Sequence, residues 1–371
     1  MARVAVQLTN FTGGELSPRL DGRNDLQKYS TGCKTLENMI IFPHGSAARR
    51  SGTQFVAEVK DSTKETRLIP FEFSTTQTYI LEFGNQYIRF FKDNGQILSS
   101  GSPYEISSPY LEAELFDIKF AQSADVMYLT HPNHPAKKLS RTGHTSWSLT
   151  NVDFTDGPYM DENISSTTIS TSAHTVGTGR TLTASSTTGI NDNTGFQTTD
   201  VGRLIRFRDG YGKITARTST TVVTIEILED MGSSSSSANW SLGAFSETTG
   251  HPSCVTFFEQ RLVFAATLSQ PQTIFFSKSG DYENMNENRG GTIADDDAII
   301  YTIASNQVNA IRFMTATRTL IIGTAGGEFA VSGGSVDTAI TPTNILIKKQ
   351  SNNGAANVDA LAVGNATLFL Q

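Results

Sequence analysis

The sequence predicts an all-β protein made of β-propeller-like blades, with an inserted small β-domain and an extended amino-terminal arm. Short runs of β-branched and aromatic residues are separated by Gly, Asn, Asp, Ser and Pro, and helix signals are scarce. The runs recur in sets of three strands joined by turns, as in a propeller, whose blades repeat every ~40 to 50 residues. A two-sheet sandwich has similar short strands and remains the alternative architecture.

The amino-terminal segment, residues 1–64, differs from the rest because turn-forming residues such as Gly13–Gly14 interrupt its apolar runs. Two short helices are expected in it, at Asp25–Tyr29 and Thr35–Met39. The segment has too many breakers for a core. We therefore expect an extended arm that packs along a blade or a neighbouring subunit.

The first propeller-like blades are expected in residues 65–160. The first set of strands comprises Arg67–Phe73, Thr78–Phe83 and Gln86–Phe91. The second set comprises Phe116–Phe120, Val126–Thr130 and Ala136–Leu139. Strands separated by such short turns are typical of an antiparallel meander.

Further blades are expected in residues 246–371. Three strands form the third set: Val255–Phe258, Arg261–Ala265 and Thr273–Ser277. Three more form the fourth set: Val308–Phe313, Thr319–Gly323 and Glu328–Ser332. A fifth set begins with Val358–Val363 and Thr367–Leu370. The chain ends there in mid-strand, and because an open edge strand invites aggregation we expect a truncated chain, or missing blades supplied by another chain.

A different segment, residues 161–245, separates the two groups of blades and is predicted to be an inserted Ser/Thr-rich β-domain. Its strands are expected at Asp200–Phe207, Tyr211–Ala216 and Thr221–Leu228. The run Ser233–Ser237 is predicted to be a flexible loop tip.

Composition excludes several classes of protein. Of the 371 residues, 37% are hydrophobic and 18% charged, and no apolar run reaches the ~18 to 20 residues of a membrane helix. The start of the chain lacks the pattern of a secretory signal. A net charge of −7 argues against wrapping nucleic acid, although DNA can pass such a surface without being held. Two isolated cysteines, Cys33 and Cys254, exclude a disulfide framework.

No constellation of side chains supports catalysis or cofactor binding, since phosphate-loop and nucleophile-elbow motifs are both missing. The nearest approach to a metal site is His131, His134 and His144 together with Asp125. Because the first two histidines flank a Pro–Asn turn, a solvated turn is the favoured interpretation. No metal site is assigned.

Three consecutive carboxylates, Asp295–Asp297, are the main acidic candidate. Paired carboxylates suit glycoside hydrolysis or calcium binding. Consecutive strand residues alternate faces, however, so at most two of the three share a site. An exposed loop before a strand at Ala298–Ile303 is therefore the favoured interpretation.

Charged residues of the arm are the candidate interface residues. Arg49–Arg50 are suited to carboxylates of a neighbouring subunit, whereas an exposed pair contributes little by itself. The candidates are Glu15, Arg19, Arg23, Asp25, Lys28, Arg49 and Arg50.

Several of these segments resemble the tail nozzle proteins of short-tailed bacteriophages, also called tail tubular protein B-like proteins. The amino-terminal resemblance rests on Asn10–Pro18, Gly22–Arg23, Asp25, Lys28–Tyr29, Gly32–Cys33, Leu36–Asn38, Pro43–Gly45 and Arg49–Thr53. Similar segments recur later at Asp200–Arg206, Phe257–Phe264 and Ser277–Asp281.

The resemblance implies a structural virion protein of the tail, assembled in the host cytoplasm, and not an enzyme. It would form a homo-oligomeric ring, expected to be six-fold, around the DNA exit channel below the portal and adaptor, and it would mount the tail fibres. Phage DNA would pass without sequence-specific binding. The alternative is a receptor-binding or glycan-processing tail fibre or spike protein, and a third interpretation is a cellular propeller scaffold.

Overall fold

A computed structural model describes residues 7–288, 291–304, 308–334, 338–364 and 366–371. The chain divides into two compact units, Met1–Ala57 and Glu58–Gln371. We describe each unit by itself.

The amino-terminal unit is built from short strands and 3-10 turns. Strands β1 and β2 pair in parallel, and β3 and β4 form an antiparallel hairpin. Its elements are β1 (Gly14–Glu15), η1 (Pro18–Leu20), η2 (Gln27–Thr31), β2 (Gly32–Cys33), β3 (Met39–Ile41) and β4 (Ala47–Arg49).

Close backbone approaches explain some of the breakers in this unit. A Cβ on Gly13 would lie 2.7 Å from the carbonyl oxygen of Lys28. Gly45 has a φ of +100°, and its carbonyl oxygen accepts a hydrogen bond from the N–H of Phe11 at 2.8 Å. Both positions therefore favour glycine. The helix predicted at Thr35–Met39 is wrong, because Asn38 (φ 56°) forms a turn that leads into β3.

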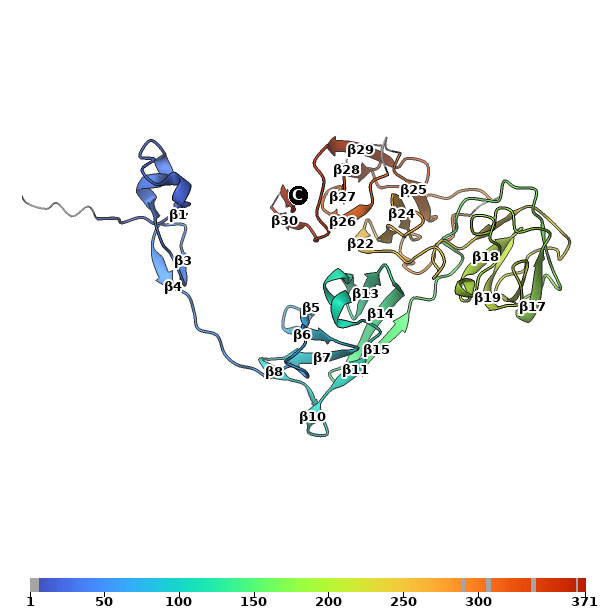
Figure 1. Ribbon diagram of the computed structural model, residues 1–371, viewed down its shortest axis with the longest axis horizontal. Helices are drawn as coiled ribbons and strands as arrows, with labels where there is room; N and C mark the ends of the chain where they lie inside the picture. Colours follow the sequence, from blue (N-terminus) through green and yellow to red (C-terminus); the bar gives the residue numbers. More distant parts are fainter. Residues whose placement is uncertain (1–6, 289–290, 305–307, 335–337, 365) are drawn as a thin grey trace, which may run out of the picture. The chain divides into compact units, whose positions relative to one another are not determined.

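Four antiparallel sheets of the second unit form the blades (Figure 1). Blade 1 contains β5 (Arg67–Ser74), β6 (Gln77–Gly84), β7 (Tyr87–Lys92), β8 (Gly95–Gln96) and β11 (Glu105–Ser107), and a hairpin of β9 (Leu98–Ser99) and β10 (Ser102–Pro103) lies between them in sequence. After η3 (Glu112–Asp117), blade 2 contains β12 (Lys119–Ser123), β13 (Val126–His131), β14 (His134–Gly143) and β15 (Ser146–Asn151).

The remaining two blades follow the inserted sheet in sequence. Blade 3 contains β22 (Cys254–Phe258), β23 (Arg261–Ala265), β24 (Thr273–Phe276) and β25 (Ile299–Thr302). Blade 4 contains β26 (Ile311–Ala316), β27 (Leu320–Thr324), β28 (Gly327–Ser332) and β29 (Leu346–Ser351). A last hairpin consists of β30 (Leu361–Val363) and β31 (Ala366–Leu368).

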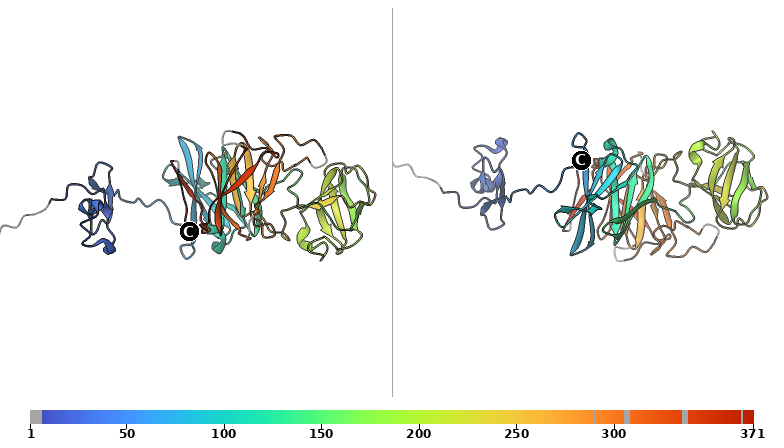
Figure 2. Two further views of the ribbon diagram at one scale, coloured as in Figure 1. Left: turned by 90° about the horizontal axis from the view of Figure 1, so that it is seen from above. Right: turned by 90° about the horizontal axis from the view of Figure 1, so that it is seen from below.

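Each inner blade buries both of its faces. In β13, Met127 and Leu129 belong to the core shared with blade 1, whereas Tyr128 belongs to the core shared with blade 3. The apolar run of β23 divides in the same way between two cores, one of them shared with blade 4. The first strands of blades 2, 3 and 4 contact one another in order, and Figure 2 shows the sheets side by side. The all-β, propeller-like fold is thus confirmed.

Some strand predictions were wrong. The segment at Phe116–Phe120 divides between η3 and β12, and Phe116 is 62% exposed. Blade 1 has five strands and the other blades have four, whereas three were predicted in each set. The strands that were not predicted are β8 and β11 of blade 1, β15 of blade 2 and β29 of blade 4. β29 reads Leu-Ile-Lys-Lys-Gln-Ser, and its polar residues hide the strand pattern in the sequence.

No helix among the described residues is long and apolar enough to cross a membrane.

The inserted sheet has six strands in the order β16-β17-β20-β19-β18-β21 and a core of its own. Its elements are β16 (Ile169–Thr171), β17 (Gly177–Ala184), η4 (Thr198–Asp200), β18 (Leu204–Phe207), β19 (Gly210–Arg217), β20 (Val222–Ile227) and β21 (Trp240–Leu242). The strand predicted at Asp200–Phe207 therefore begins four residues later.

The run Ser233–Ser237 is not a free tip. Ser237 forms a β-bridge with Ile169, and the N–H of Thr171 donates to the carbonyl oxygen of Ser234 at 3.2 Å. The guanidinium of Arg208 donates to the carbonyl oxygen of Ser235 at 3.2 Å. These bonds hold the serines along the edge strand β16.

Candidate functional site

Two histidines meet at the turn between β13 and β14. His131 ends β13 and His134 begins β14, and the two are cross-strand partners. Side chains of paired residues lie on the same face of a sheet, and the two ring centroids are 5.2 Å apart. A local hairpin therefore brings both rings together.

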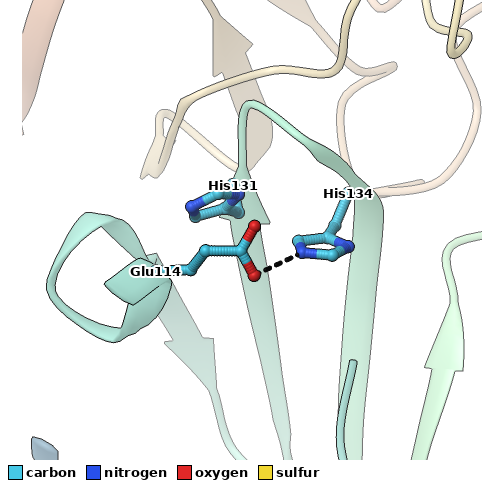
Figure 3. A group of neighbouring side chains, drawn as sticks. All are labelled: Glu114, His131 and His134. Atoms are coloured by element: carbon cyan, nitrogen blue, oxygen red, sulfur yellow. Dashed lines mark hydrogen bonds and ion pairs between the residues drawn. The ribbon is translucent and has the colours of Figure 1, made fainter. Parts of the chain in front are cut away.

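A carboxylate from the connection between blades 1 and 2 completes the group. Glu114 lies in η3, and its Oε2 is 2.8 Å from Nε2 of His134. One ligand atom from each of Glu114, His131 and His134 lies within 4.8 Å of the others. Figure 3 shows the carboxylate between the two rings, with the bond to His134 drawn as a dashed line.

Local bonds determine which atoms of this group carry protons. Burial lowers the pKa of His131, which is 2% exposed, so the ring is neutral near pH 7. Its Nδ1 lies 3.2 Å from the N–H of Asn133 and accepts that bond, so the ring proton lies on Nε2. Partial burial raises the pKa of Glu114, but hydrogen bonds from the Leu111 N–H and the His134 ring outweigh it, and the net pKa is lowered.

Of the four residues that the sequence analysis grouped as the nearest approach to a metal site, only His131 and His134 lie together. Asp125 pairs with Arg141 at 2.8 Å, and Nδ1 of His144 lies 2.7 Å from the hydroxyl of Tyr79. Neither Asp125 nor His144 lies beside His131 and His134. The third member of the group is Glu114 instead. No local signal marks Glu114, because it lies 17 positions before His131, between the first and second predicted sets of strands.

Asp295–Asp297 hold a loop and do not converge on a site. Asp295 and Asp296 are exposed, but Asp297 is buried and pairs with Lys278 at 2.9 Å, so the prediction of an exposed loop is wrong for Asp297. The guanidinium of Arg261 donates to the carbonyl oxygens of Asp295 at 2.7 Å and Asp297 at 2.6 Å. Among the described residues, these carboxylates form no metal-ligand group.

Two later segments of the resemblance meet around Arg261. Its guanidinium donates to the carbonyl oxygen of Ser277 at 2.7 Å, and the N–H of Gly280 donates to the carbonyl oxygen of Gln260 at 2.8 Å. Arg261 is 2% exposed. The segments Phe257–Phe264 and Ser277–Asp281 are thus bound to each other in blade 3, which gives them a role in folding.

The other segment of the resemblance contains a buried ion pair. Asp200 and Arg203 lie 2.9 Å apart, and both side chains are fully buried. Burial lowers the pKa of Arg203. The pair joins η4 to the loop before β18, so it too has a role in folding.

All seven candidate interface residues of the arm are exposed. Arg23 and Asp25 pair with each other at 2.7 Å. Nε of Arg50 donates to the side-chain oxygen of Asn38 at 2.7 Å, and Glu15 accepts a bond from the N–H of Leu36 at 2.8 Å. The structure brings only Arg23 and Asp25 together, and the others are spread over the unit.

The described residues of the amino-terminal unit, 7–57, form no hydrophobic core. Gly45 alone among them is buried. Large apolar side chains are exposed instead: Met39 by 40%, Ile40 by 49%, Phe42 by 39%, Phe55 by 76% and Val56 by 44%. Sequence reasoning singled out the charges of this unit and missed these apolar residues, which the strand-like run Met39–Phe42 could have indicated.

Comparison with known proteins finds similarity to solved structures alone. No family model matches the chain, and no curated protein matches its sequence. Among solved structures, it is similar to the RRP9 WD40 repeats, at 11% identity and a TM-score of 0.24, over 81% of this chain and 87% of that one.

Two further structures are similar to the same degree. YCF48 bound to D1 peptide has 11% identity and a TM-score of 0.20, over 76% of this chain and 83% of that one. The endosialidase of phage phi92 has 7% identity and a TM-score of 0.22, over 78% of this chain and 59% of that one. At these identities and TM-scores, the similarities carry no argument about activity or partners, and the fold is described from the chain's own sheets.

Proposed function

We propose that this chain is a structural subunit of a short phage tail, of the nozzle type, and not an enzyme. Its copies would form a ring around the DNA exit channel, below the portal and adaptor, and would carry the tail fibres. The proposal starts from the amino-terminal segments Asn10–Pro18 and Arg49–Thr53, which resemble those of nozzle proteins.

The observation that carries the proposal is the lack of a hydrophobic core among residues 7–57, the described part of the amino-terminal unit. Ordering a residue costs about 1–2 kcal/mol of backbone entropy, and burial of apolar surface is the main term that offsets it. The described residues of this unit bury no apolar side chain. A segment of this kind keeps a fixed fold when another surface covers it, as a neighbouring subunit in a ring would do.

Charge supports the same proposal. The net charge of −7 makes the chain a poor binder of phosphate groups. A channel built from such subunits would repel DNA and let it slide during exit.

Two experiments test the proposal. Labelling the protein in the intact particle and imaging it by electron microscopy should show a ring at the distal end of the tail axis. Label on radial appendages would instead favour receptor binding, and absence from the particle would refute a virion role.

The second experiment reverses the charges of Arg49 and Arg50 to Glu, which should abolish incorporation into particles while the purified chain stays folded. The matched control reverses Lys348 and Lys349, which are also adjacent and exposed on a strand. Normal assembly of the Arg49 and Arg50 variant would contradict the proposed interface.

A further inference from the structure

We propose that Glu114, His131 and His134 bind one divalent transition-metal ion, and that Zn²⁺ fits this donor set best. Two imidazole nitrogens and one carboxylate oxygen form a known three-ligand zinc set, in which a water molecule takes the fourth position. Imidazole donors disfavour Mg²⁺ and Ca²⁺, which prefer oxygen ligands.

The distances suit a compact ion. Ligand atoms at ~2.0–2.2 Å from a tetrahedral zinc ion lie roughly 3.3 Å from one another. Glu114 and His134 are already 2.8 Å apart, and the widest separation in the group is at most 4.8 Å. Small side-chain rotations therefore bring all three donors to bonding distance.

Neighbouring backbone atoms already orient the donors. The N–H of Leu111 donates to Oε2 of Glu114 at 2.9 Å and holds the carboxylate in place. Because His131 accepts a bond at Nδ1, it already presents a lone pair there, and a metal ion would compete with the Asn133 N–H at 3.2 Å. A supporting bond such as the one from Leu111 to the Glu114 carboxylate is typical of metal sites.

A buried tyrosine lies beside the donors. The hydroxyl of Tyr110 is buried and has no hydrogen-bond partner among the described residues. The Tyr110 ring packs edgewise on His134, with the ring centroids 5.3 Å apart. Tyr110 is therefore a further polar residue next to the group.

The bound ion would link two parts of the fold that are distant in sequence. Glu114 belongs to the connection between blades 1 and 2, and the histidines belong to a turn of blade 2. At present the side chains of His134 and Asn133 join the turn to Glu114 by hydrogen bonds of 2.8 and 3.4 Å. An ion held by all three ligands would fix that connection to the turn more firmly. The site would therefore stiffen the junction between two blades.

The test measures Co²⁺ and Zn²⁺ binding by the full chain without a histidine tag. Tetrahedral Co²⁺ absorbs strongly in the visible range, so a titration gives both stoichiometry and geometry. We expect one Co²⁺ per chain, displaced by Zn²⁺, and a rise in Tm with Zn²⁺ because an ion that binds the folded state stabilises it.

Two variants remove single ligands with little change of packing, since both side chains are partly exposed: His134→Ala and Glu114→Gln. Each should weaken binding by more than the ~10- to 100-fold typical of a lost supporting residue and abolish the Zn²⁺-dependent rise in Tm. The matched control is His174→Ala, which removes a histidine paired with Asp230 at 3.0 Å and should leave binding unchanged.

Two results would overturn the proposal. One is the lack of saturable Co²⁺ absorption in the unaltered chain. The other is equal binding by the unaltered chain and both ligand variants, which would place the ion elsewhere and leave Glu114 and His134 as a simple hydrogen-bonded pair.

Discussion

Removing the carboxylate of Asp200 should destabilise the inserted sheet more than removing an exposed ion pair of that sheet would. The carboxylate accepts four hydrogen bonds of 2.7–2.9 Å, from Arg203, Asn191, Thr248 and the N–H of Gln197. Asp200→Ala leaves a buried guanidinium without its counter-charge. Breaking such a pair costs about 3–5 kcal/mol.

The structure places the expected loss near the lower end of that range. Arg203 keeps three acceptors after the substitution: the carbonyl oxygen of Gly243 and Oδ1 of Asn191, both at 2.7 Å, and Sδ of Met160 at 3.2 Å. A loss of ~3 kcal/mol lowers the Tm of a domain of this size by roughly 12–24 °C if the sheet unfolds independently. Replacing both members by apolar residues, as Asp200→Leu with Arg203→Met, should recover much of the loss.

Tryptophan fluorescence can report on the inserted sheet alone. The chain has two tryptophans, and Trp240 lies in the core of the inserted sheet while Trp147 lies in the core of blades 1 and 2. With Trp147→Phe in every protein compared, thermal unfolding is followed through Trp240. The control is Asp153→Ala, whose carboxylate is 87% exposed and pairs with Lys213 of β19. Equal Tm shifts for Asp200→Ala and Asp153→Ala would refute the reasoning.

Three further predictions concern other parts of the chain. Replacing Ile40 and Phe42 by Ser should reduce the oligomer measured by light scattering without unfolding the chain, whereas Ile80→Ser on blade 1, equally exposed at 41%, should not. Burial tends to raise the pKa of Asp297, but the Ala294 N–H and Lys278 lower it overall. Its contribution to stability is therefore present above pH ~4 and is lost as the pH falls through the lowered pKa, and Asp297→Asn should flatten an acid-unfolding curve in that range. Gly45→Ala should destabilise the amino-terminal unit, because the φ of +100° strains a residue with a Cβ, and limited proteolysis within residues 7–57 measures this.

Strands with continuous apolar runs could be predicted because the blades bury both faces. Leu262–Ala265 of β23 is one such run, and all four residues are buried, as is Arg261 before them. The outer strand of blade 4, β29, could not be predicted, because Lys348 and Lys349 are both exposed and interrupt its apolar pattern. Helix prediction at Thr35–Met39 failed for a related reason, since a single turn at Asn38 redirects the chain.

The candidate site shows the same division between local and non-local information. Two residues separate His131 from His134 in the sequence, and hairpin pairing across that turn brings the two histidines together. Glu114 reaches them only through the packing of η3 against the blades, which has no periodic signal. Reasoning from sequence could therefore find two of the three donors but substituted Asp125 and His144, which are nearer in the chain and lie elsewhere in the fold.

The arm shows why charges and apolar residues of one interface should be tested separately. Exposed ion pairs contribute little affinity, whereas burial of apolar surface supplies ~25 cal/mol per Å². Arg49 and Arg50 should therefore govern partner choice and association rate. Ile40 and Phe42, on or beside the neighbouring strand β3, should govern the lifetime of the assembly. Association and dissociation kinetics of the two pairs of variants separate these roles, and a variant of Ile40 and Phe42 that dissociates as slowly as the unaltered chain would place the covering surface elsewhere.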